Sequence, residues 1–390
     1  MQPDQALESL AAQAVTIISR DELRAKLAKG KPLRVKLGVD PSTTDLHLGH
    51  SIVLRKLRQF QDFGHQAVLI IGDFTGMIGD PSGRSATRPN LTRDQVALNA
   101  KTYFDQAFKI LDPSKTETRY NSEWFAPMSF ENVVRLTSHV TLQQLLHRDD
   151  FRKRMRKDHP IRAHEMLYPI MQGWDSVMVK ADVELGGTDQ LFNILMGREL
   201  QREEGQPEQV VLLTPILEGL DGSEKMSKSL GNHIAINELP SEMFGKLMSI
   251  SDTAMQAYYS LLLNKSVPDI HPVEAKKQLA FEVVQTYHSA DAAKRTLDDW
   301  NTRFSKRDLA HVDLPPYSPG ERLDFTAVAV VSDVYRNVFR LDKSRSEVSR
   351  LIKQGSVEID GTKITDPKAK IALHPGQILR LDRKHAVRIA

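Results

Sequence analysis

The sequence contains no cysteine, and this absence removes several kinds of chemistry at once. Without a thiol among its 390 residues, the chain cannot form disulfides, hold zinc or iron–sulfur clusters through thiolates, or use a cysteine nucleophile. Long apolar runs are missing too: the longest, such as 68–71 and 327–331, are far shorter than the roughly 20 residues that span a membrane. The first residues show no basic leader followed by an apolar stretch. We therefore expect a cytoplasmic protein with no membrane partner.

The remaining composition is that of a globular protein with one unusual feature, the distribution of charge. Hydrophobic residues make up 40% and charged residues 26%, which argues against disorder and fibrous repeats. Residues 331–390 contain 13 Lys or Arg and 7 Asp or Glu, a net charge of +6, whereas the preceding 330 residues carry −3. A basic tail on a near-neutral body suggests a polyanion-binding appendage, although a solvated basic surface is an equal alternative.

The order of the predicted elements indicates a doubly wound α/β domain with a parallel sheet over residues 1–220. A helix over 5–29 is followed by a strand over 33–39, a helix over 47–64 and a buried strand over 67–71, which together predict a βαβ unit. The other predicted elements of this domain are helices over 92–111, 130–147 and 164–180, a strand over 183–185, a helix over 188–203 and a strand over 209–213.

Three segments follow this domain. Residues 221–305 are predicted to be mostly helical, and 306–323, with three prolines and a glycine, are typical of a linker. Residues 324–390 predict a compact basic α+β module, in which a helix over 344–354 precedes a hairpin turning at Asp360-Gly361.

Two histidines stand at the start of the helix over 47–64, where an open parallel sheet gathers anionic ligands. The segment has neither a GxGxxG nor a GxxxxGK[ST] motif. Instead, His47 and His50 lie on one face of the first helical turn, and Gly49 lets another group approach the backbone. This pattern suggests imidazoles that donate hydrogen bonds to phosphate oxygens; a metal pair or two surface histidines are the alternatives.

A second loop, Lys225-Met226-Ser227-Lys228-Ser229, places two ammonium groups three residues apart. Lysines are mobile point charges suited to a pyrophosphate whose charge builds up during a reaction. By itself the loop could simply be solvated. Together with the histidines, about 175 residues earlier, it indicates chemistry on a nucleotide phosphate.

These two segments resemble the HIGH and KMSKS signatures of the class I aminoacyl-tRNA synthetases, and nearly the whole chain resembles the bacterial tyrosyl-tRNA synthetases. The segments VDPSTTDLHLGH, GDFTGMIGDPSGR, LYPIMQGWDS and GGTDQLFN follow that family's pattern and order. The resemblance implies a ligase that joins L-tyrosine to ATP and then transfers it to the 3′-terminal ribose of tRNA(Tyr). It also implies Mg²⁺ with the ATP phosphates, no structural metal and a homodimer.

The first step needs no general base, because the attacking α-carboxylate of tyrosine, with a pKa of about 3.5, is already ionised at neutral pH. The resemblance gives catalysis to residues that stabilise the departing pyrophosphate: His47, His50, Lys225, Lys228, Arg84 and Arg88. For the two arginines, exposed loop residues are the alternative. The implied ATP contacts are Gly38, Gly49, Gly187, Asp189 and Met226 together with His47, His50, Lys225 and Lys228.

The predicted tyrosine site centres on Tyr168, Gln172 and Asp175, whose spacing of i, i+4 and i+7 places them on one helix face. A core stripe would not be expected to include Gln and Asp. The resemblance gives Asp175 the phenolic hydroxyl, and it gives the α-amino group to Tyr168, Gln172 and Asp80. The other implied substrate contacts are Gln190, Asp40 and Lys36.

Lys36 departs from the commoner pattern. Many tyrosyl-tRNA synthetases have a phenol-binding tyrosine two residues before the glycine of the first strand. This chain resembles a bacterial subgroup that has lysine there. The resemblance therefore does not assign a second contact to the phenol, and selection would depend more on Asp175.

Residues from about 324 resemble the RNA-binding module named after ribosomal protein S-four, on the segments 344–352 and 355–361. The tRNA contacts that this implies are Arg345, Arg350 and Lys353, whose charges suit phosphate contacts; for any one of them a solvated role is the alternative. A second basic run, 152–157, could touch the acceptor stem or form an exposed loop.

Two other functions remain open at this stage. A small-molecule nucleotidyltransferase can share the histidine motif, but it explains neither the lysine loop nor the basic tail. A non-enzymatic RNA-binding paralogue would not need His47, His50, Lys225, Lys228 and Asp175. Tryptophanyl enzymes are the nearest relatives with which the chain could be confused.

Overall fold

The computed structural model describes residues 3–41, 44–82, 91–302, 314–320, 324–382 and 385–390. The chain divides into two compact units, residues 1–293 and 294–390, which are described separately below as the first and the second unit. Within the described ranges, no helix combines the length and hydropathy needed to cross a lipid bilayer.

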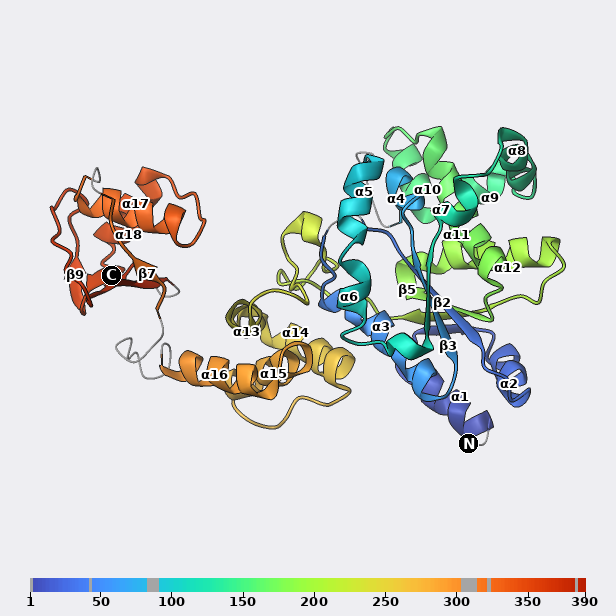
Figure 1. The fold of residues 1–390 in the computed structure, drawn as a ribbon, viewed down its shortest axis with the longest axis horizontal. Coiled ribbons are helices and arrows are strands. Elements are labelled where there is room, and N and C mark those ends of the chain that lie inside the picture. The colour runs from blue at the N-terminus through green and yellow to red at the C-terminus, as the bar shows by residue number, and fades with distance from the viewer. Residues whose placement is uncertain (1–2, 42–43, 83–90, 303–313, 321–323, 383–384) are drawn as a thin grey trace. The chain divides into compact units, whose positions relative to one another are not determined.

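The first unit is built on a six-stranded sheet with the order β1-β6-β5-β2-β3-β4 (Figure 1). The strands are β1 (Thr16–Ile18), β2 (Arg34–Val39), β3 (Gln66–Ile71), β4 (Thr116–Tyr120), β5 (Val183–Gly187) and β6 (Val210–Thr214). Strands β2 to β6 run parallel, and β1 pairs antiparallel with β6 at the edge. The predicted doubly wound α/β fold is confirmed.

The topology places a ligand-binding edge between β2 and β5. From β2 the chain moves outward to β3, and from β5 it moves outward to β6 in the opposite direction. Right-handed crossovers then put α3 (Leu48–Asp62) and α12 (Leu191–Glu203) on opposite faces of the sheet. The loops after β2 and β5 diverge at this switch point, which leaves a crevice at the carboxyl ends of the strands.

Two glycines allow α11 (Ala163–Val179) and α12 to pack closely on the same face of the sheet. A Cβ at Gly173 of α11 would lie 3.0 Å from the backbone nitrogen of Gly197. A Cβ at Gly197 would lie 2.9 Å from the Ser176 hydroxyl. This close approach sets the position of α11 over β2 and β5.

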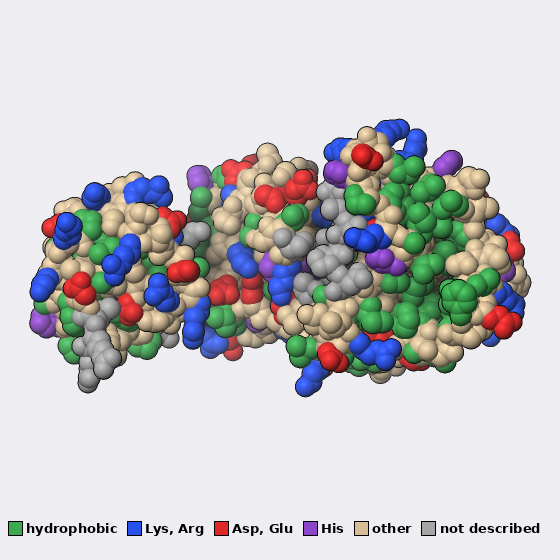
Figure 2. Space-filling view, turned by 90° about the horizontal axis from the view of Figure 1, so that it is seen from above, with side chains coloured by type: hydrophobic (Ala, Val, Ile, Leu, Met, Phe, Trp, Pro, Cys, Tyr) green, Lys and Arg blue, Asp and Glu red, His purple; other side chains and the backbone are tan. Residues whose placement is uncertain are grey.

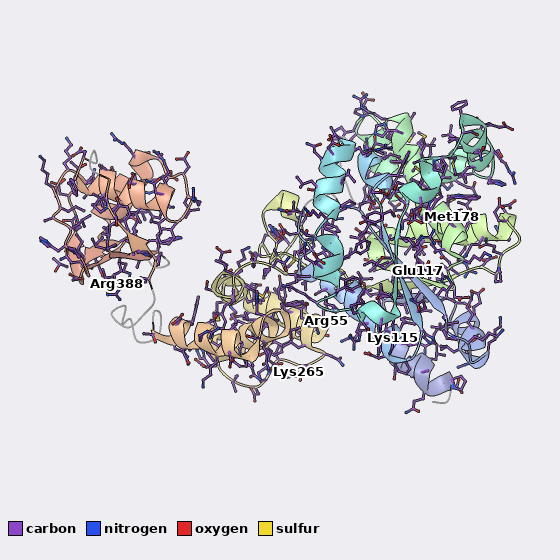
Figure 3. The ribbon with its side chains drawn as sticks, viewed as in Figure 1. Arg55, Lys115, Glu117, Met178, Lys265 and Arg388 are labelled. Carbon is purple, nitrogen blue, oxygen red and sulfur yellow. The ribbon has the colours of Figure 1, made fainter. Side chains whose placement is uncertain are left out.

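Further helices complete the first unit. Those before β6 are α1 (Pro3–Ala11), α2 (Arg20–Ala28), α4 (Thr75–Ile78), α5 (Arg93–Ala100), α6 (Tyr103–Ala107), α7 (Ser122–Phe125), α8 (Phe130–Ser138), α9 (Leu142–Leu146) and α10 (Asp149–Arg156). Those after β6 are α13 (Pro240–Ser249), α14 (Asp252–Tyr258), α15 (Pro272–Tyr287) and α16 (Ala290–Trp300), the last reaching into the second unit. The guanidinium of Arg55 on α3, labelled in Figure 3, lies 5.9 Å from the ring centroid of Tyr287 on α15.

Three predicted helices differ from the structure. The single helix over 5–29 is wrong: α1 ends at Ala11, the chain turns at Gln13 with φ of +61°, and β1 follows before α2. β1 consists of Thr-Ile-Ile, β-branched residues that favour a strand and find a partner in β6. The helices over 92–111 and 130–147 are each two shorter helices, and β4 was not predicted because its sequence, TETRY, is polar.

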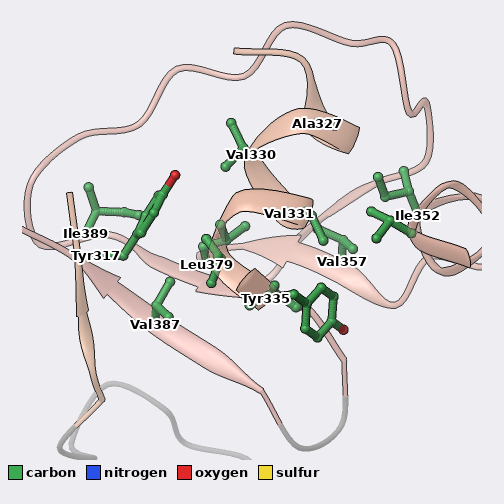
Figure 4. Packing of buried hydrophobic residues seen from close by; sticks show 13 residues of the cluster. Tyr317, Ala327, Val330, Val331, Tyr335, Ile352, Val357, Leu379, Val387 and Ile389 are labelled. Carbon is green, nitrogen blue, oxygen red and sulfur yellow. The ribbon is translucent and has the colours of Figure 1, made fainter. Parts of the chain in front are cut away.

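The second unit packs α17 (Ala327–Asn337) and α18 (Arg345–Lys353) on a small sheet with the order β7-β11-β10-β8-β9. The strands are β7 (Pro316–Tyr317), β8 (Val357–Ile359), β9 (Thr362–Ile364), β10 (Ile378–Arg380) and β11 (Ala386–Ile389). Aliphatic side chains of both helices meet Leu379, Val387 and Tyr317 from the sheet (Figure 4).

Asp360 and Gly361 have φ of +47° and +81°, as the predicted hairpin requires. Because β7 pairs with β11, its two residues belong to this sheet rather than to a linker.

Candidate active site

A cleft of about 470 Å³ opens at the carboxyl ends of β2 and β5. It brings together nearly all residues predicted to bind tyrosine or ATP, from segments far apart in the sequence. They are Gly38, Asp40, His47, Gly49, His50, Asp80, Tyr168, Gln172, Asp175, Gly187, Asp189, Gln190, Lys225, Met226 and Lys228. Lys36 does not line the cleft, and Arg84 and Arg88 lie outside the described residues.

The two histidines stand at the N-terminal end of α3, with their ring centroids 3.9 Å apart. The backbone N–H of His47 donates to Nδ1 of His50 at 3.3 Å. Burial, assisted by the charge of Lys225, lowers the pKa of His50 to about 4, and burial followed by the charge of His50 lowers the pKa of His47 far below its usual value. Both imidazoles are therefore neutral at pH 7, and they offer hydrogen bonds rather than full positive charges.

Gly49 fits between these histidines and the lysine loop. A Cβ added there would lie 3.0 Å from Nδ1 of His47 and 3.6 Å from Cβ of Met226. The glycine therefore lets the His47 ring fold back over the first helical turn, and it keeps this part of the cleft open.

The lysine loop faces α3 across the cleft, and each lysine is paired with a carboxylate. Nζ of Lys225 lies 2.9 Å from Oδ2 of Asp189, and Nζ of Lys228 lies 2.9 Å from Oδ2 of Asp45. Asn232, which the sequence analysis missed, accepts the backbone N–H of Ser227 at 2.8 Å. The loop is thus held in place with both ammonium groups at the border of the cleft.

At the other end of the cleft, Asp175 is 3% exposed. It accepts hydrogen bonds from Nε1 of Trp124 at 2.9 Å and from Nδ2 of Asn121 at 3.4 Å. Burial raises the pKa of Asp175 to about 7, against the opposing effect of the Lys36 charge. Neither Trp124 nor Asn121 was predicted; both come from the region just after β4, the strand that the sequence analysis also missed.

A chain of amide contacts connects the remaining predicted residues. Nε2 of Gln190 donates to Asp80 at 2.8 Å, and Nδ2 of Asn193 donates to the side-chain oxygens of Gln190 and Gln172 at 3.1 and 2.9 Å. Arg148, which is also buried, donates to Asn193. Asn193 ends the segment GGTDQLFN, so its position three residues after Gln190 was a usable signal, whereas Arg148 carried none.

Tyr168 and Asp40 form a direct link between α11 and the end of β2. The Tyr168 hydroxyl donates to Oδ2 of Asp40 at 2.8 Å, while Oδ1 of Asp40 accepts from the Thr75 hydroxyl at the same distance. With Asp80 nearby in the lining, this side of the cleft presents carboxylates and hydroxyls, which suit a cationic amine.

Lys36 lies beneath the cleft. Its ammonium group donates to the backbone oxygen of Gln172 at 2.8 Å and to the Ser176 hydroxyl at 2.7 Å, and it lies 3.0 Å from Oε1 of Glu184. The Lys36 side chain is 0% exposed, and its predicted direct contact with substrate stays a prediction.

The predicted RNA-contacting side chains lie on the second unit. Arg345, Arg350 and Lys353 are all exposed on α18, and Figure 2 shows further Lys and Arg side chains over this unit. In the first unit, the basic run 152–157 is mostly the helix α10 and not a loop. Arg154 of that helix is buried in an ion pair with Glu165, so it is not available for an RNA contact.

Comparisons with known proteins agree with this arrangement. The family model described as tRNA synthetases class I (W and Y) matches residues 28–305, and the S4 domain model matches residues 340–376. The tyrosine–tRNA ligase of Oleidesulfovibrio alaskensis is 48% identical and covers 100% of this chain and 99% of its own length. That of Idiomarina loihiensis is 48% identical, with coverages of 93% and 92%.

Solved structures show the same fold. The tyrosyl-tRNA synthetase of Archaeoglobus fulgidus, complexed with L-tyrosine, has a TM-score of 0.63 at 22% identity and covers 76% of this chain and 99% of its own. That of Aeropyrum pernix has a TM-score of 0.61 at 19% identity, with coverages of 76% and 98%. The family-model match, together with relatives of this identity over nearly their whole length, shows that the chain belongs to the tyrosine–tRNA ligases, class I aminoacyl-tRNA synthetases that carry an S4 domain.

Proposed function

We propose that the cleft between β2 and β5 is the site at which this ligase activates L-tyrosine with ATP. The observation that carries the proposal is the polarity of the cleft. A buried carboxyl, Asp175, lies at one end, and neutral imidazoles and ammonium groups line the other. A phenol with its amino acid backbone fits the first end, and a polyphosphate fits the second.

Tyrosine would lie along α11 with its hydroxyl toward Asp175. The carboxylate already accepts two hydrogen bonds from Trp124 and Asn121, and these bonds fix its direction. Asp80 and the hydroxyl of Tyr168 would receive the α-amino group, with Gln172 and Gln190 held in position by Asn193. An amino acid without the phenolic hydroxyl would leave the buried Asp175 carboxyl without this hydrogen bond. The free-energy cost of that unpaired group would select for tyrosine.

ATP would lie between the N-terminus of α3 and the lysine loop. His47 and His50 would donate to phosphate oxygens, and Gly38, Gly187 and Asp189 would border the ribose. The cleft would hold the tyrosine carboxylate in line with the α-phosphorus. The reaction then becomes effectively unimolecular, which lowers its entropic barrier. As pyrophosphate leaves, Lys225 would separate from Asp189 and Lys228 from Asp45. Both ammonium groups would then pair with the growing negative charge of the pyrophosphate.

A Mg²⁺ ion fits this scheme as a companion of ATP. Among the described residues, no group of three His, Asp or Glu side chains is arranged to hold a metal, so we assign the ion to the phosphate oxygens. When bound, it would share the charge of the leaving pyrophosphate. We also place the enzyme in the cytoplasm, together with its substrate tRNA(Tyr).

The second step would join the two units through tRNA(Tyr). The exposed Arg345, Arg350 and Lys353 of α18 would contact RNA phosphates, which position the molecule without reading its bases. The 3′-terminal ribose hydroxyl would then attack the tyrosyl-adenylate in the cleft, and the adenylate would be the leaving group.

We infer further that the ligase is a homodimer, joined through an apolar face of the first unit. Figure 2 shows a broad band of hydrophobic side chains on this unit. Phe130 of α8 is 83% exposed, and Val134 of α8 and Leu142 of α9 are exposed too. Met178 of α11, labelled in Figure 3, is also exposed. Exposed apolar side chains on neighbouring helices are typical of an interface, and a second copy of the chain supplies a matching surface.

The first prediction concerns Asp175. Wild-type enzyme should exchange pyrophosphate into ATP with tyrosine and not with tryptophan. Asp175→Asn should raise the tyrosine KM roughly ten- to a hundredfold, because a hydrogen bond to a charged group contributes about 1.5–3 kcal/mol. The ATP KM measured in the same assay is the control. Exchange with tryptophan alone, or an unchanged tyrosine KM in the variant, would contradict the proposal.

The second prediction concerns the lysine loop. Lys228→Met should lower kcat for tyrosine activation by roughly 10²–10³-fold, as for other groups that stabilise transition-state charge, while the tyrosine KM stays near the wild-type value. Lys265→Met, which removes a surface lysine paired with Glu282, is the matched control. Equal effects of both variants in pre-steady-state activation would show that Lys228 has no special role.

The third prediction separates RNA binding from activation. The triple variant Arg345→Ala, Arg350→Ala, Lys353→Ala should raise the tRNA KM and leave tyrosine-dependent pyrophosphate exchange unchanged. Each lost phosphate contact should reduce the slope of log KM against log salt concentration by about one unit. A triple variant with wild-type aminoacylation kinetics across the salt series would rule out these contacts.

The fourth prediction tests the homodimer by sedimentation at micromolar concentration. Phe130→Asp should convert a dimer of twice 44.0 kDa into monomers, because a carboxylate buried in an apolar interface has no partner. Val273→Asp, at an exposed apolar position of α15, should leave the dimer intact. A wild-type protein that sediments as a monomer would refute the inference.

A further inference from the structure

A buried ion pair lies directly beneath the tyrosine end of the cleft. The side chains of Lys36 and Glu184 are 0% and 1% exposed, and Nζ of Lys36 lies 3.0 Å from Oε1 of Glu184. The two residues are register partners on the adjacent parallel strands β2 and β5. Two positions further along each strand, on the same face, stand Gly38 and Gly186, which do line the cleft.

The pair is fastened to α11 on both sides of Asp175. Lys36 donates to the backbone oxygen of Gln172 and to the hydroxyl of Ser176. The same hydroxyl donates to Oε2 of Glu184 at 2.8 Å, and Nε2 of Gln172 donates to Oε1 of Glu184 at 3.3 Å. Gln172 and Ser176 precede and follow Asp175 by three residues and one residue. The contacts therefore fix the segment of helix that carries the carboxyl.

Stability alone gives little reason for such a pair. Removing two charges from water costs several kcal/mol per ion, and an apolar pair of similar volume is often as stable. An apolar pair would supply neither a positive charge behind Asp175 nor a hydrogen-bond donor for the backbone carbonyl of Gln172. Both effects act on the segment of α11 that carries Asp175.

The charge of Lys36 acts on Asp175 in a definite direction. Burial makes the charged form of Asp175 costly and raises its pKa, whereas the Lys36 charge lowers that pKa, and Glu184 on β5 acts more weakly in the opposite direction. The other groups that touch the carboxyl, Asn121 and Trp124, are neutral donors. Tyr168 and Asp40 are the further titratable groups in this part of the cleft, and they are bonded to each other.

We propose that Lys36 is a positioning and specificity residue: through its hydrogen bonds to Gln172 and Ser176, its ammonium group holds the segment of α11 that carries Asp175 and keeps the Asp175 carboxyl directed toward the phenolic hydroxyl of tyrosine. This inference rests on the proposed function of the cleft. Lys36 touches no substrate in this scheme. It ensures that the Asp175 carboxyl accepts a hydrogen bond from the ligand. Only a ligand with a hydroxyl, such as tyrosine, can donate that bond.

The test compares Lys36→Met with Lys36→Arg in the full-length enzyme. The readout is tyrosine-dependent pyrophosphate exchange between pH 6 and pH 9, with phenylalanine as the competing substrate. In wild type, the tyrosine KM should rise as the pH falls through about 7, because Asp175 then becomes protonated. In Lys36→Met this rise should move to higher pH by about one unit, which gives a roughly fivefold higher KM at pH 7, because wild-type Asp175 is already about half protonated there.

Several further results are expected if the inference is correct. Lys36→Met should change kcat and the ATP KM little, and it should reduce the preference for tyrosine over phenylalanine. Lys36→Arg, which keeps the charge, should return the pH profile toward that of wild type. A purely structural role would not produce a pH shift that a conservative variant reverses.

Folding is controlled within the same series. In Lys36→Met the Glu184 carboxyl keeps donors from Ser176, Gln172 and Gln209, and circular dichroism and urea unfolding would verify the fold. Should that variant unfold, the double variant Lys36→Met, Glu184→Gln removes both charges; it should show a smaller KM shift in the same direction, because the opposing Glu184 charge is also gone.

The outcomes separate the two proposals. A folded Lys36→Met or double variant with the wild-type tyrosine KM, pH profile and phenylalanine discrimination would overturn the role of Lys36 alone. A wild-type enzyme that fails to exchange pyrophosphate with tyrosine would instead overturn the proposed function of the cleft.

Discussion

The reversal of strand order between β2 and β5 is the constraint on which the site depends. Because right-handed crossovers carry α3 and α12 to opposite faces, the loops that leave these two strands separate. A crevice forms between them with no need for large side chains to hold it open. Gly38 and Gly186 then remove bulk at the strand ends, and the N-terminal end of α3, with His47 and His50, borders the same space.

Within this crevice, the groups proposed to meet phosphate carry little unpaired positive charge. Both loop lysines have carboxylate partners, and both histidines are neutral because they are buried. Under the proposed function, a phosphate chain would therefore not meet a dense field of bare positive charge. It would replace Asp45 and Asp189 as the partner of Lys228 and Lys225, and the net gain would be largest when the phosphate charge is largest, which is at the transition state and in the product.

The sequence could predict the site residues that belong to short motifs or to one helix face. It could not predict the residues that reach the site through strand pairing or through contacts between distant elements. His47, His50, Lys225 and Lys228 occur in short motifs, and the helical spacing of Tyr168, Gln172 and Asp175 correctly gave one face. Trp124 and Asn121 reach Asp175 because polar β4 pairs with β3, and Arg148, just before α10, reaches Asn193 on α12 through a hydrogen bond. No local period encodes such contacts. The helix predicted over 5–29 failed for a related reason: β1 exists through its pairing with β6.

Lys36 shows how a buried charge can matter for recognition without meeting the ligand. An ammonium group in the cleft itself would lie against an uncharged phenol and would have to be desolvated for no gain. One layer deeper, it is satisfied by Glu184, Ser176 and a backbone oxygen, so its own cost is met inside the protein. Its field still reaches Asp175 in surroundings of low polarity, where such interactions are stronger than in water. Selectivity for a hydroxyl is then a property of the sheet beneath the pocket as well as of the residues that line it.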